Sequence, residues 1–375
     1  MARGLNRRYK YLLTFAICVV FVLTLTICSP ASVSFINIKN PSFIQLLKNA
    51  FSNPSNSPQP RIAAILAVTL HKRYLFTLPF AVAAWQKLGV EPIVIIVGDY
   101  NVLLRQHQSK TAIDLVLELG GRIHFIMNDT VAEATLSQTS RLFAAAMPFS
   151  SDFKDDDIFI TSDSDIIPFH LANHIPNPLA KQRLYIYNAA CYGTTKVPPA
   201  HGYYSVPMYP MTTIGATVSA WREIMGFRWK KFSGEDIELY LKTEFGQNFF
   251  HPDDGERADL KSSLIWYADQ ALVSYKISRW FKRNSKNKWS TTLPQACSRR
   301  IDRADWPMPS NMSKIDLTEW DDAHVPEWGF KAGQWHLFKP LINRLFEGEK
   351  YEELRKRFEK YRVDYISKDC CDDVI

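Results

Sequence analysis

The stretch DDDIFITSDSDIIPF, residues Asp155–Phe169, decides the fold. Its apolar part, Asp157–Thr161, has the length of a buried strand, and it runs directly into Asp163-Ser164-Asp165. A second apolar pair and Pro168 follow these polar residues. The stretch therefore predicts a strand inside a sheet, with two carboxylates at the point where that strand ends.

Strand-like and helix-like segments alternate on the N-terminal side of this stretch. Apolar runs of strand length are separated by segments with helical periodicity, and several of them close at Gly. The predicted strands are 62–69, 92–97 and 122–127, and the predicted helices are 79–88, 111–119 and 137–147. This alternation predicts a doubly wound, mostly parallel α/β sheet flanked by helices, with ligands at the carboxyl ends of its strands.

The sequence after Pro168 is less regular, with loops rich in Pro, Tyr and Gly up to Pro210. Helical periodicity returns in four later segments, 218–225, 235–244, 268–280 and 349–362. The last of these is charged and is expected to close the domain. No internal repeat or low-complexity tract interrupts the pattern.

The N-terminus carries four basic residues, Arg3, Arg7, Arg8 and Lys10, ahead of the uncharged apolar run Tyr11–Cys28. A run of about 18 apolar residues just suffices to cross a bilayer as a helix, and a positive flank is expected on the cytosolic side. We expect a cytosolic tail at 1–10, an uncleaved signal-anchor helix at 11–28, a stem rich in Asn, Ser and Pro at 29–60, and a lumenal domain at 61–375. The chain is thus predicted to be a single-pass type II membrane protein.

Cysteines and glycosylation sequons fit a lumenal domain. Four cysteines outside the anchor, Cys191, Cys297, Cys370 and Cys371, allow one or two disulfides whose pairing the sequence leaves open. The sequons are at Asn128 and Asn311. No spacing of Cys and His indicates structural zinc.

The composition indicates a globular protein, because 46% of the 375 residues are hydrophobic and 22% are charged. The formal net charge of +7 is modest and favours anionic partners such as nucleotide phosphates or acidic glycans. Nothing resembles a nucleic-acid-binding stripe, so nucleic acid is excluded as a partner.

Asp163 and Asp165 have the chemistry of a metal site. Carboxylates at alternate positions just past a buried strand can both turn towards one cation. Hard divalent ions such as Mn²⁺ and Mg²⁺ prefer oxygen ligands and leave positions open for phosphate oxygens. The arrangement suits the departure of a nucleoside diphosphate, whose charge must be neutralised. The acidic residues at 155–157 are interpreted as a solvated turn.

These residues resemble metal-dependent glycosyltransferases of the GT-A fold, which bind a nucleotide sugar through an Asp-x-Asp motif. Several blocks in order resemble the glycogenin-like retaining transferases more closely. The blocks are AVTLHKRYLFTLPFAVAAW at 67–85, SQTSRLFAAA at 137–146, FITSDSDIIPF at 159–169, TTIGATVSAWREI at 212–224, WYADQALVSYKI at 266–277 and GQWHLFKP at 333–340. The resemblance implies a GT-A domain with a nucleotide-binding half at 61–170, an acceptor-binding half at 171–345, and a C-terminal helix and tail at 346–375.

The resemblance also implies roles for single residues. Thr69 and Tyr74 would meet the base and ribose, Arg141 would approach the donor, and Asp163, Ser164 and Asp165 would form the metal motif. Asp269 and Gln270 would face the reacting sugar, His336 would be a third metal ligand, and Lys339 would contact the diphosphate. Only Leu337 and Phe338 separate His336 from Lys339, without the Gly that is usual in this block.

Another acidic pair, Glu235 and Asp236, leaves the stereochemistry open. An inverting transferase needs a carboxylate that takes the proton of the acceptor hydroxyl, and either residue would serve. A retaining transferase of the glycogenin kind needs no such base, and would use Asp269 and Gln270. The alternative interpretation of Glu235 and Asp236 is a capped helix start, with Ser233 three residues before Asp236.

The sequence hypothesis is therefore a Golgi-type transferase that moves a sugar from a UDP-sugar to a glycan or glycoprotein acceptor, using Mn²⁺ or Mg²⁺, with retention preferred over inversion. The endoplasmic reticulum is the less favoured location. Two rivals remain: a metal-dependent phosphohydrolase or nucleotidyltransferase, which predicts more acidic ligands for a second metal, and a non-catalytic lumenal glycan-binding or scaffold protein, which predicts a broken metal motif.

Overall fold

The computed structural model describes residues 59–127, 133–177, 181–227, 232–247, 265–283, 290–291 and 299–367. They lie in one unit that runs from Ser57 to Ile375. The predicted anchor at 11–28, most of the stem, and the sequon at Asn128 lie outside the described residues. Within the described ranges, no helix has the length and apolar character that a bilayer crossing requires.

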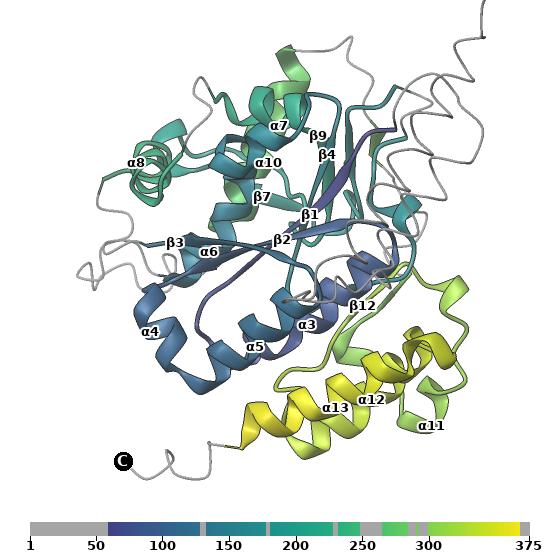
Figure 1. The fold of residues 1–375 in the computed structure, drawn as a ribbon. Coiled ribbons are helices and arrows are strands. Elements are labelled where there is room, and N and C mark those ends of the chain that lie inside the picture. The colour runs from purple at the N-terminus through teal and green to yellow at the C-terminus, as the bar shows by residue number, and fades with distance from the viewer. Residues whose placement is uncertain are drawn as a thin grey trace, which may run out of the picture. The chain divides into compact units, whose positions relative to one another are not determined.

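A seven-stranded sheet in the order β10-β6-β9-β4-β1-β2-β3 forms the centre of this unit (Figure 1). Strands β4, β1, β2 and β3 are parallel, whereas β9 is antiparallel to both β4 and β6. The prediction of a mostly parallel α/β sheet is confirmed, and the one reversed strand makes it mixed. The strands are β1 Ile62–Val68, β2 Glu91–Val97, β3 Arg122–Ile126, β4 Ile158–Ser162, β6 Leu184–Ile186, β9 Ile214–Thr217 and β10 Ser290–Thr291.

Helices cover both faces of the sheet (Figure 1). One face carries α3 Lys72–Lys87, α5 His107–Glu118, α12 Ala332–Leu345 and α13 Glu352–Ile366. The other carries α6 Glu133–Ser140, the 3-10 helix η1 Arg141–Ala146, α7 Val218–Met225, α8 Gly234–Phe245 and α10 Ala268–Arg283. The short helices α4 Tyr100–Arg105 and α11 Pro309–Met312 complete the set of described α-helices.

Two small sheets accompany the large one. The first contains β11 Arg300–Ile301, β12 Asp322–His324 and β5 Ile166–Pro168, and the second pairs β7 Thr194–Lys196 with β8 Ser205–Pro207. Strand β5 directly follows the Asp163-Ser164-Asp165 turn. Its antiparallel partner β12 therefore brings a late part of the chain to that turn.

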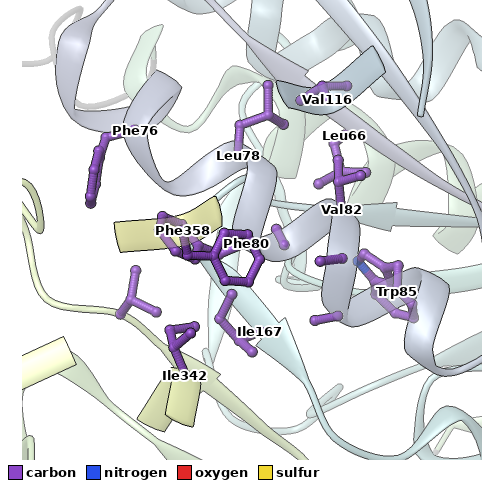
Figure 2. Packing of buried hydrophobic residues seen from close by; sticks show 14 of the residues in the cluster. Leu66, Phe76, Leu78, Phe80, Val82, Trp85, Val116, Ile167, Ile342 and Phe358 are labelled. Atoms are coloured by element: carbon purple, nitrogen blue, oxygen red, sulfur yellow. The ribbon is translucent and has the colours of Figure 1, made fainter. Parts of the chain in front are cut away.

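Alternate residues of the central strand β1 enter different cores. Leu66 lies in the core beneath α3 and the C-terminal helices, whereas Ile65 lies in the core beneath α7 and α10. The first core is rich in aromatic rings, and Phe80 of α3 lies 4.5 Å from Phe358 of α13 between ring centroids (Figure 2). Burying each such side chain contributes about 1.5–3 kcal/mol. The strand is consequently held rigidly from both sides up to its carboxyl end.

Helix α3 begins seven residues earlier than the sequence predicts, and it contains Pro79 in its interior. Proline has no N–H and leaves the carbonyl four residues earlier, that of Leu75, without its helical donor. The hydroxyl of Tyr361 in α13 lies 3.3 Å from the Leu75 carbonyl oxygen and 3.2 Å from that of Phe76, and donates to this pair. The expected helix start at Pro79 is therefore wrong because a distant tyrosine replaces the missing donor.

The segment predicted as one helix over 137–147 divides at Ser140 into α6 and the tighter η1. Thr139 donates its hydroxyl to the Thr135 carbonyl at 2.8 Å, and Ser140 donates to Ser137 at 2.8 Å. Such back-bonding weakens and bends α-helical geometry. The break places Arg141 at the first position of η1, from which its side chain reaches the end of β4.

Gly215 sits where β9 passes close to a neighbouring loop. A Cβ atom at this position would lie 2.5 Å from the carbonyl oxygen of His174. We predict that Gly215→Ala lowers the free energy of unfolding by about 1–3 kcal/mol, because the backbone must move to admit the methyl group. Urea denaturation measures this, with Gly333→Ala, which meets no atom within 4 Å, as the matched control. Equal stability of the two variants would contradict the prediction.

Candidate active site

The site begins at the carboxyl end of β4, all of whose residues are buried. Ser162 closes the strand, where its hydroxyl accepts from the Trp85 indole N–H at 3.1 Å and donates to the Asp163 carbonyl at 3.1 Å. The Ile166 N–H then donates to the same carbonyl at 3.3 Å and closes a turn. Asp163 and Asp165 are thus fixed at the edge of the sheet, and Ser164 is buried between them.

Arg141 joins two carboxylates at this edge. Its Nη1 donates to Asp163 Oδ1, and its Nη2 donates to Asp269 Oδ2 at 2.9 Å. Arg141 lies at the start of η1 and Asp269 in the first turn of α10, so the three residues come from separate elements. The arginine and Asp269 are 5% and 3% exposed, so the Arg141–Asp269 pair is buried, whereas the Asp163 side chain is partly open to solvent.

The two carboxylates share one guanidinium, and their pKa values move in opposite directions. Burial alone would raise the pKa of Asp163, but the Arg141 charge and then His324 outweigh burial, so the pKa lies below its usual value. Burial raises the pKa of Asp269 to about 6 despite Arg141, and the Asp163 charge adds to the rise. The Asp163 side chain is 30% exposed and that of Asp269 5%. The more solvated carboxylate therefore keeps its charge.

This raised pKa predicts a pH-dependent stability. Between the ordinary Asp pKa near 4 and about 6, the folded state binds the Asp269 proton more tightly than the unfolded state does. The stability that this proton contributes is complete below pH 4 and is lost as the pH rises through about 6. Relative to Asp269→Asn, the wild-type free energy of unfolding should fall by up to about 1.4 kcal/mol per pH unit across this window.

Urea denaturation of both proteins between pH 4 and 7 in EDTA measures the difference. Groups that do not interact with Asp269 titrate alike in both proteins and cancel. A difference that stays constant across the window would contradict the assignment of the raised pKa to Asp269.

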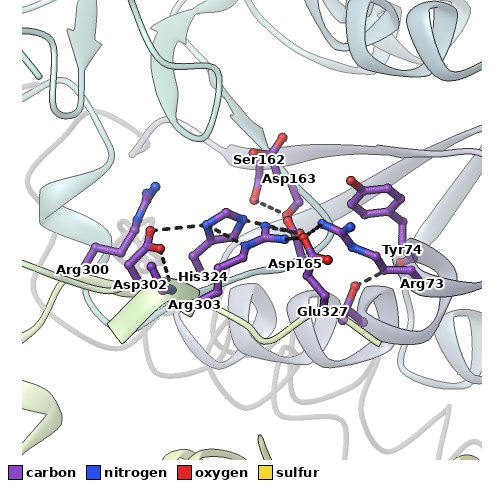
Figure 3. A network of polar contacts seen from close by, with 12 residues as sticks. Arg73, Tyr74, Ser162, Asp163, Asp165, Arg300, Asp302, Arg303, His324 and Glu327 are labelled. Carbon is purple, nitrogen blue, oxygen red and sulfur yellow. Dashed lines mark hydrogen bonds and ion pairs between the residues drawn. The ribbon is translucent and has the colours of Figure 1, made fainter. Parts of the chain in front are cut away.

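Asp165 belongs to a second cluster, which β12 brings to the turn (Figure 3). Antiparallel pairing aligns His324 with Ile166, and the Val325 N–H donates to the Asp165 carbonyl at 3.0 Å. Asp165 Oδ2 accepts from Arg303 Nη2 at 2.7 Å and lies 3.5 Å from His324 Nε2. Neither Arg303 nor His324 is among the site residues predicted from the sequence.

The opposite edge of the His324 ring, at Nδ1, contacts Asp302 and Arg303. Nδ1 of His324 lies 3.4 Å from Asp302 Oδ2 and 3.2 Å from Arg303 Nε. The hydrogen bond from His324, with burial opposing it, sets the pKa of Asp302 below its usual value. The imidazole is therefore held in place, with Nε2 directed to Asp165.

A cavity of about 530 Å³ adjoins Arg303. Glu327 on its wall accepts from Arg303 at 3.2 Å and pairs with Arg73 of α3 at 2.8 Å. Lys331 lies 4.9 Å above the Trp328 ring, and both residues line the same cavity. Two cations, one carboxylate and an indole therefore line this space, and one of the cations, Arg303, also contacts Asp165.

The predicted nucleotide-contacting residues lie on the α3 side of this cluster. Tyr74 is half-buried beneath the Arg73 guanidinium at 4.7 Å, and Thr69 accepts from the His71 N–H at 3.2 Å. Burial raises the pKa of Tyr74. The charges of Arg73 and Arg303 oppose this rise, and those of Asp165 and Asp163 add to it. Tyr74 therefore lies close enough to interact electrostatically with both carboxylates of the motif.

The predicted late block lies elsewhere. His336 is an exposed residue of α12, and Lys339 pairs with Glu359 of α13 at 2.6 Å. Among the described residues, neither contacts Asp163 or Asp165. His324, rather than His336, is the histidine beside the carboxylates.

Glu235 and Asp236 are both exposed at the start of α8. Asp236 Oδ2 accepts from the N–H and the hydroxyl of Ser233 at 2.8 Å each, and the Asp236 N–H donates to Ser233 Oγ at 3.2 Å. This reciprocal pattern is a capping box. The interpretation of Asp236 as part of a helix cap is confirmed.

The donor atoms at the turn fit a divalent cation whose coordination is completed by a bound ligand. No three Asp, Glu, His or Cys side chains in the described ranges form a ready-made cluster. However, Asp163 engages Arg141 through Oδ1 and Asp165 engages its neighbours through Oδ2. As far as the described residues go, Asp163 Oδ2 and Asp165 Oδ1 have no hydrogen-bond partner. Two free carboxylate oxygens and a nearby imidazole suit Mn²⁺, with phosphate oxygens filling the remaining positions.

Comparison with protein-family models and with curated protein sequences finds no match. Among solved structures, the chain is similar to the bifunctional glycosyltransferase WbbM at 11% identity and a TM-score of 0.39, covering 81% of this chain and 52% of that one. It is also similar to the glycosyltransferase GlyE of Streptococcus pneumoniae, at 13% identity and a TM-score of 0.33, covering 81% and 61%. An active-site mutant of LgtC matches at 15% identity and a TM-score of 0.35, covering 79% and 100%.

The chain thus spans about half of the WbbM chain and about three fifths of the GlyE chain. These TM-scores lie below 0.5, and the likenesses do not establish the function of this chain.

Proposed function

We propose that the chain is a metal-dependent glycosyltransferase that moves a sugar from a UDP-sugar to a glycan or glycoprotein acceptor. One observation carries this proposal. Two carboxylates follow the buried strand β4, each is held through one oxygen by an arginine, and the second oxygen of each has no hydrogen-bond partner among the described residues. One of these arginines, Arg303, also lines a cavity with Lys331 and Trp328.

Asp163 and Asp165 would hold Mn²⁺ or Mg²⁺, with His324 as the third protein donor. When bound, the cation supplies charge neutralisation for the diphosphate leaving group. Arg141 and Arg303 orient the two carboxylates and limit their charge before the cation arrives. In many metal sites, the groups that form hydrogen bonds to the metal ligands tune the metal affinity in this way.

The cavity that adjoins Arg303 has the chemistry that a nucleoside diphosphate requires. Arg303 and Lys331 provide cations for phosphate oxygens, and Trp328 provides an aromatic face. Thr69 and Tyr74, on the α3 side, would meet the base and ribose, as the family resemblance implies. We assign the phosphate-binding role to Lys331 in place of Lys339, because Lys339 lies on α12 and is paired with Glu359 of α13.

Retention of configuration is the preferred stereochemistry. Asp236 is engaged in its capping box, whereas Asp269 and Gln270 begin α10 beside Arg141. Gln270 Oε1 is buried and, among the described residues, has no hydrogen-bond partner. A buried acceptor without a donor is costly, and a sugar hydroxyl would satisfy it. Asp269 and Gln270 would thus position the transferred sugar.

The proposed location is the Golgi membrane, with the transferase domain in the lumen. Three features support it: the N-terminal apolar run with its basic flank, the disulfide-bonded state of Cys191, and the exposure of the sequon residue Asn311 on α11. Disulfides persist mainly in oxidising compartments.

The test is nucleotide release by the full-length protein across a panel of nucleotide sugars, in Mn²⁺ and in EDTA. We expect UDP release from one UDP-sugar, in Mn²⁺ only. NMR of the product with an acceptor then reports its anomeric configuration. Absence of release from every donor, together with absence of Mn²⁺-dependent UDP binding, would contradict the proposal.

A further inference from the structure

A second cavity, of about 330 Å³, lies between the end of α7 and the C-terminal half of α10. Its walls carry three cationic side chains of α10, Lys276, Arg279 and Arg283, at positions i, i+3 and i+7. This spacing puts all three on one face of the helix. The lysine and both arginines therefore project towards a single small space.

The charges around this cavity do not cancel. Lys276 is matched by Glu244 at 2.5 Å, and Glu223, a carboxylate of the wall, is matched by Arg183 at 2.6 Å. Arg279 donates to the neutral hydroxyl of Tyr275 at 2.7 Å. In the described part of the chain, neither Arg279 nor Arg283 has a carboxylate partner, so two positive charges remain.

The three cations also affect one another. Burial lowers the pKa of Lys276, and the charges of Arg279 and Arg283 lower it further, against the opposing effect of Glu244. Like charges that crowd one cavity are unfavourable. A bound anion would relieve this repulsion, and a neutral ligand would not.

The cavity also has an apolar part and a limited size. Ile224, Met225 and Trp280 contribute apolar surface to its wall. Its volume lies near the lower end of the range of small-molecule pockets, about 300–1,000 Å³. A sugar ring with one acidic substituent combines an apolar face with a negative charge, whereas a peptide helix or a bilayer surface needs a longer groove or a flat face.

We infer that this cavity binds the acidic group of a saccharide, with Arg279 and Arg283 as the anion-binding residues. It lies apart from the carboxylate site, since these cations follow Asp269 on α10 by 10 and 14 residues, or about 15–21 Å along the helix axis at about 1.5 Å per residue. A glycan carrying a carboxylate or a sulfate could thus be held at a distance from the reacting groups. The inference goes beyond the proposed transfer reaction and does not depend on the donor site.

Two glycosides that differ only at C6 provide the test: methyl β-glucuronide, which carries a carboxylate, and methyl β-glucoside, which does not. Their dissociation constants for the full-length protein can be measured by ligand-observed NMR, beside inorganic sulfate as a free anion. We expect the glucuronide to bind at least tenfold more tightly than the glucoside. The double variant Arg279→Gln/Arg283→Gln should lose at least tenfold in glucuronide affinity.

Lys282→Gln provides the matched control, because Lys282 is an exposed cation of the same helical turn that does not line the cavity. It should keep glucuronide affinity within about twofold. Equal binding of the two glycosides, no binding of either, or an equal loss in Lys282→Gln would overturn the inference. Sulfate that binds as tightly as the glucuronide would also overturn it, by showing a general anion site. None of these results bears on UDP release, so the two proposals fail separately.

Discussion

Asp165→Asn should reduce Mn²⁺-dependent UDP release by about 1,000-fold or more. The substitution replaces one of the two carboxylates that follow β4 and removes a negative charge from the proposed cation site. Charge stabilisation by a metal contributes several kcal/mol at a leaving phosphate, and about 1.4 kcal/mol corresponds to a factor of ten in rate. Initial rates at saturating donor, in the wild type and the variant, measure the loss.

Asp156→Asn is the matched control, because Asp156 is an exposed aspartate in the turn ahead of the same strand. It should keep the wild-type rate within about twofold. Circular dichroism and thermal unfolding of Asp165→Asn test whether Arg303, left without this carboxylate, disturbs the fold. A folded Asp165→Asn variant with more than a tenth of the wild-type rate would contradict a metal role for Asp165.

Arg141→Met should lower the free energy of unfolding by about 3–5 kcal/mol at pH 8. The guanidinium is nearly buried and contacts Asp163 and Asp269, so its removal leaves two carboxylates without their counter-charge. Removing one partner from a buried ion pair costs about this much, because an uncompensated charge stays buried. Urea denaturation in EDTA measures the change.

Two comparisons make this result specific. Arg357→Met removes an exposed arginine whose carboxylate partners lie 3.7 and 3.9 Å away, and should cost at most about 1 kcal/mol. Asp269→Asn in the Arg141→Met background removes one of the stranded charges and should recover part of the lost stability. Equal stability of Arg141→Met and Arg357→Met would show that Arg141 does not neutralise Asp163 and Asp269. The same would follow if Asp269→Asn lowered the free energy of unfolding as much in the Arg141→Met background as in the wild type.

Much of the fold can be predicted from the sequence, because the local patterns and the final packing agree. The apolar runs that become β1 and β2 are short and continuous, and helix α7 has the predicted bounds, 218–225. The errors come from distant contacts. Tyr361 is 282 positions from Pro79 and supplies the donor that lets α3 continue through the proline. The reversed direction of β9 depends on where the chain returns to the sheet, which no local pattern specifies.

The site shows the same division. Arg141, Asp163, Asp165 and Asp269 were predicted as site residues, Arg141 and Asp269 through the family resemblance. The structure brings all four to one edge of the sheet. The sequence did not predict His324, because the strand that carries it has only three residues, and its pairing with β5 spans more than 150 positions. The block at 333–340 was predicted to reach the site because it contains a His and a Lys. Helix α12 instead keeps these two residues away from the carboxylates.

The most direct test of the central claim, that Asp163 and Asp165 form a metal site completed by a diphosphate, is an electron paramagnetic resonance titration of Mn²⁺. Free Mn²⁺ gives a six-line signal that weakens when the ion is bound. The full-length protein should diminish this signal strongly when UDP is present and more weakly without it, and Asp165→Asn should leave it close to that of Mn²⁺ with UDP alone. A wild-type signal that UDP and protein together leave unchanged, or an equal loss in the variant, would contradict the account.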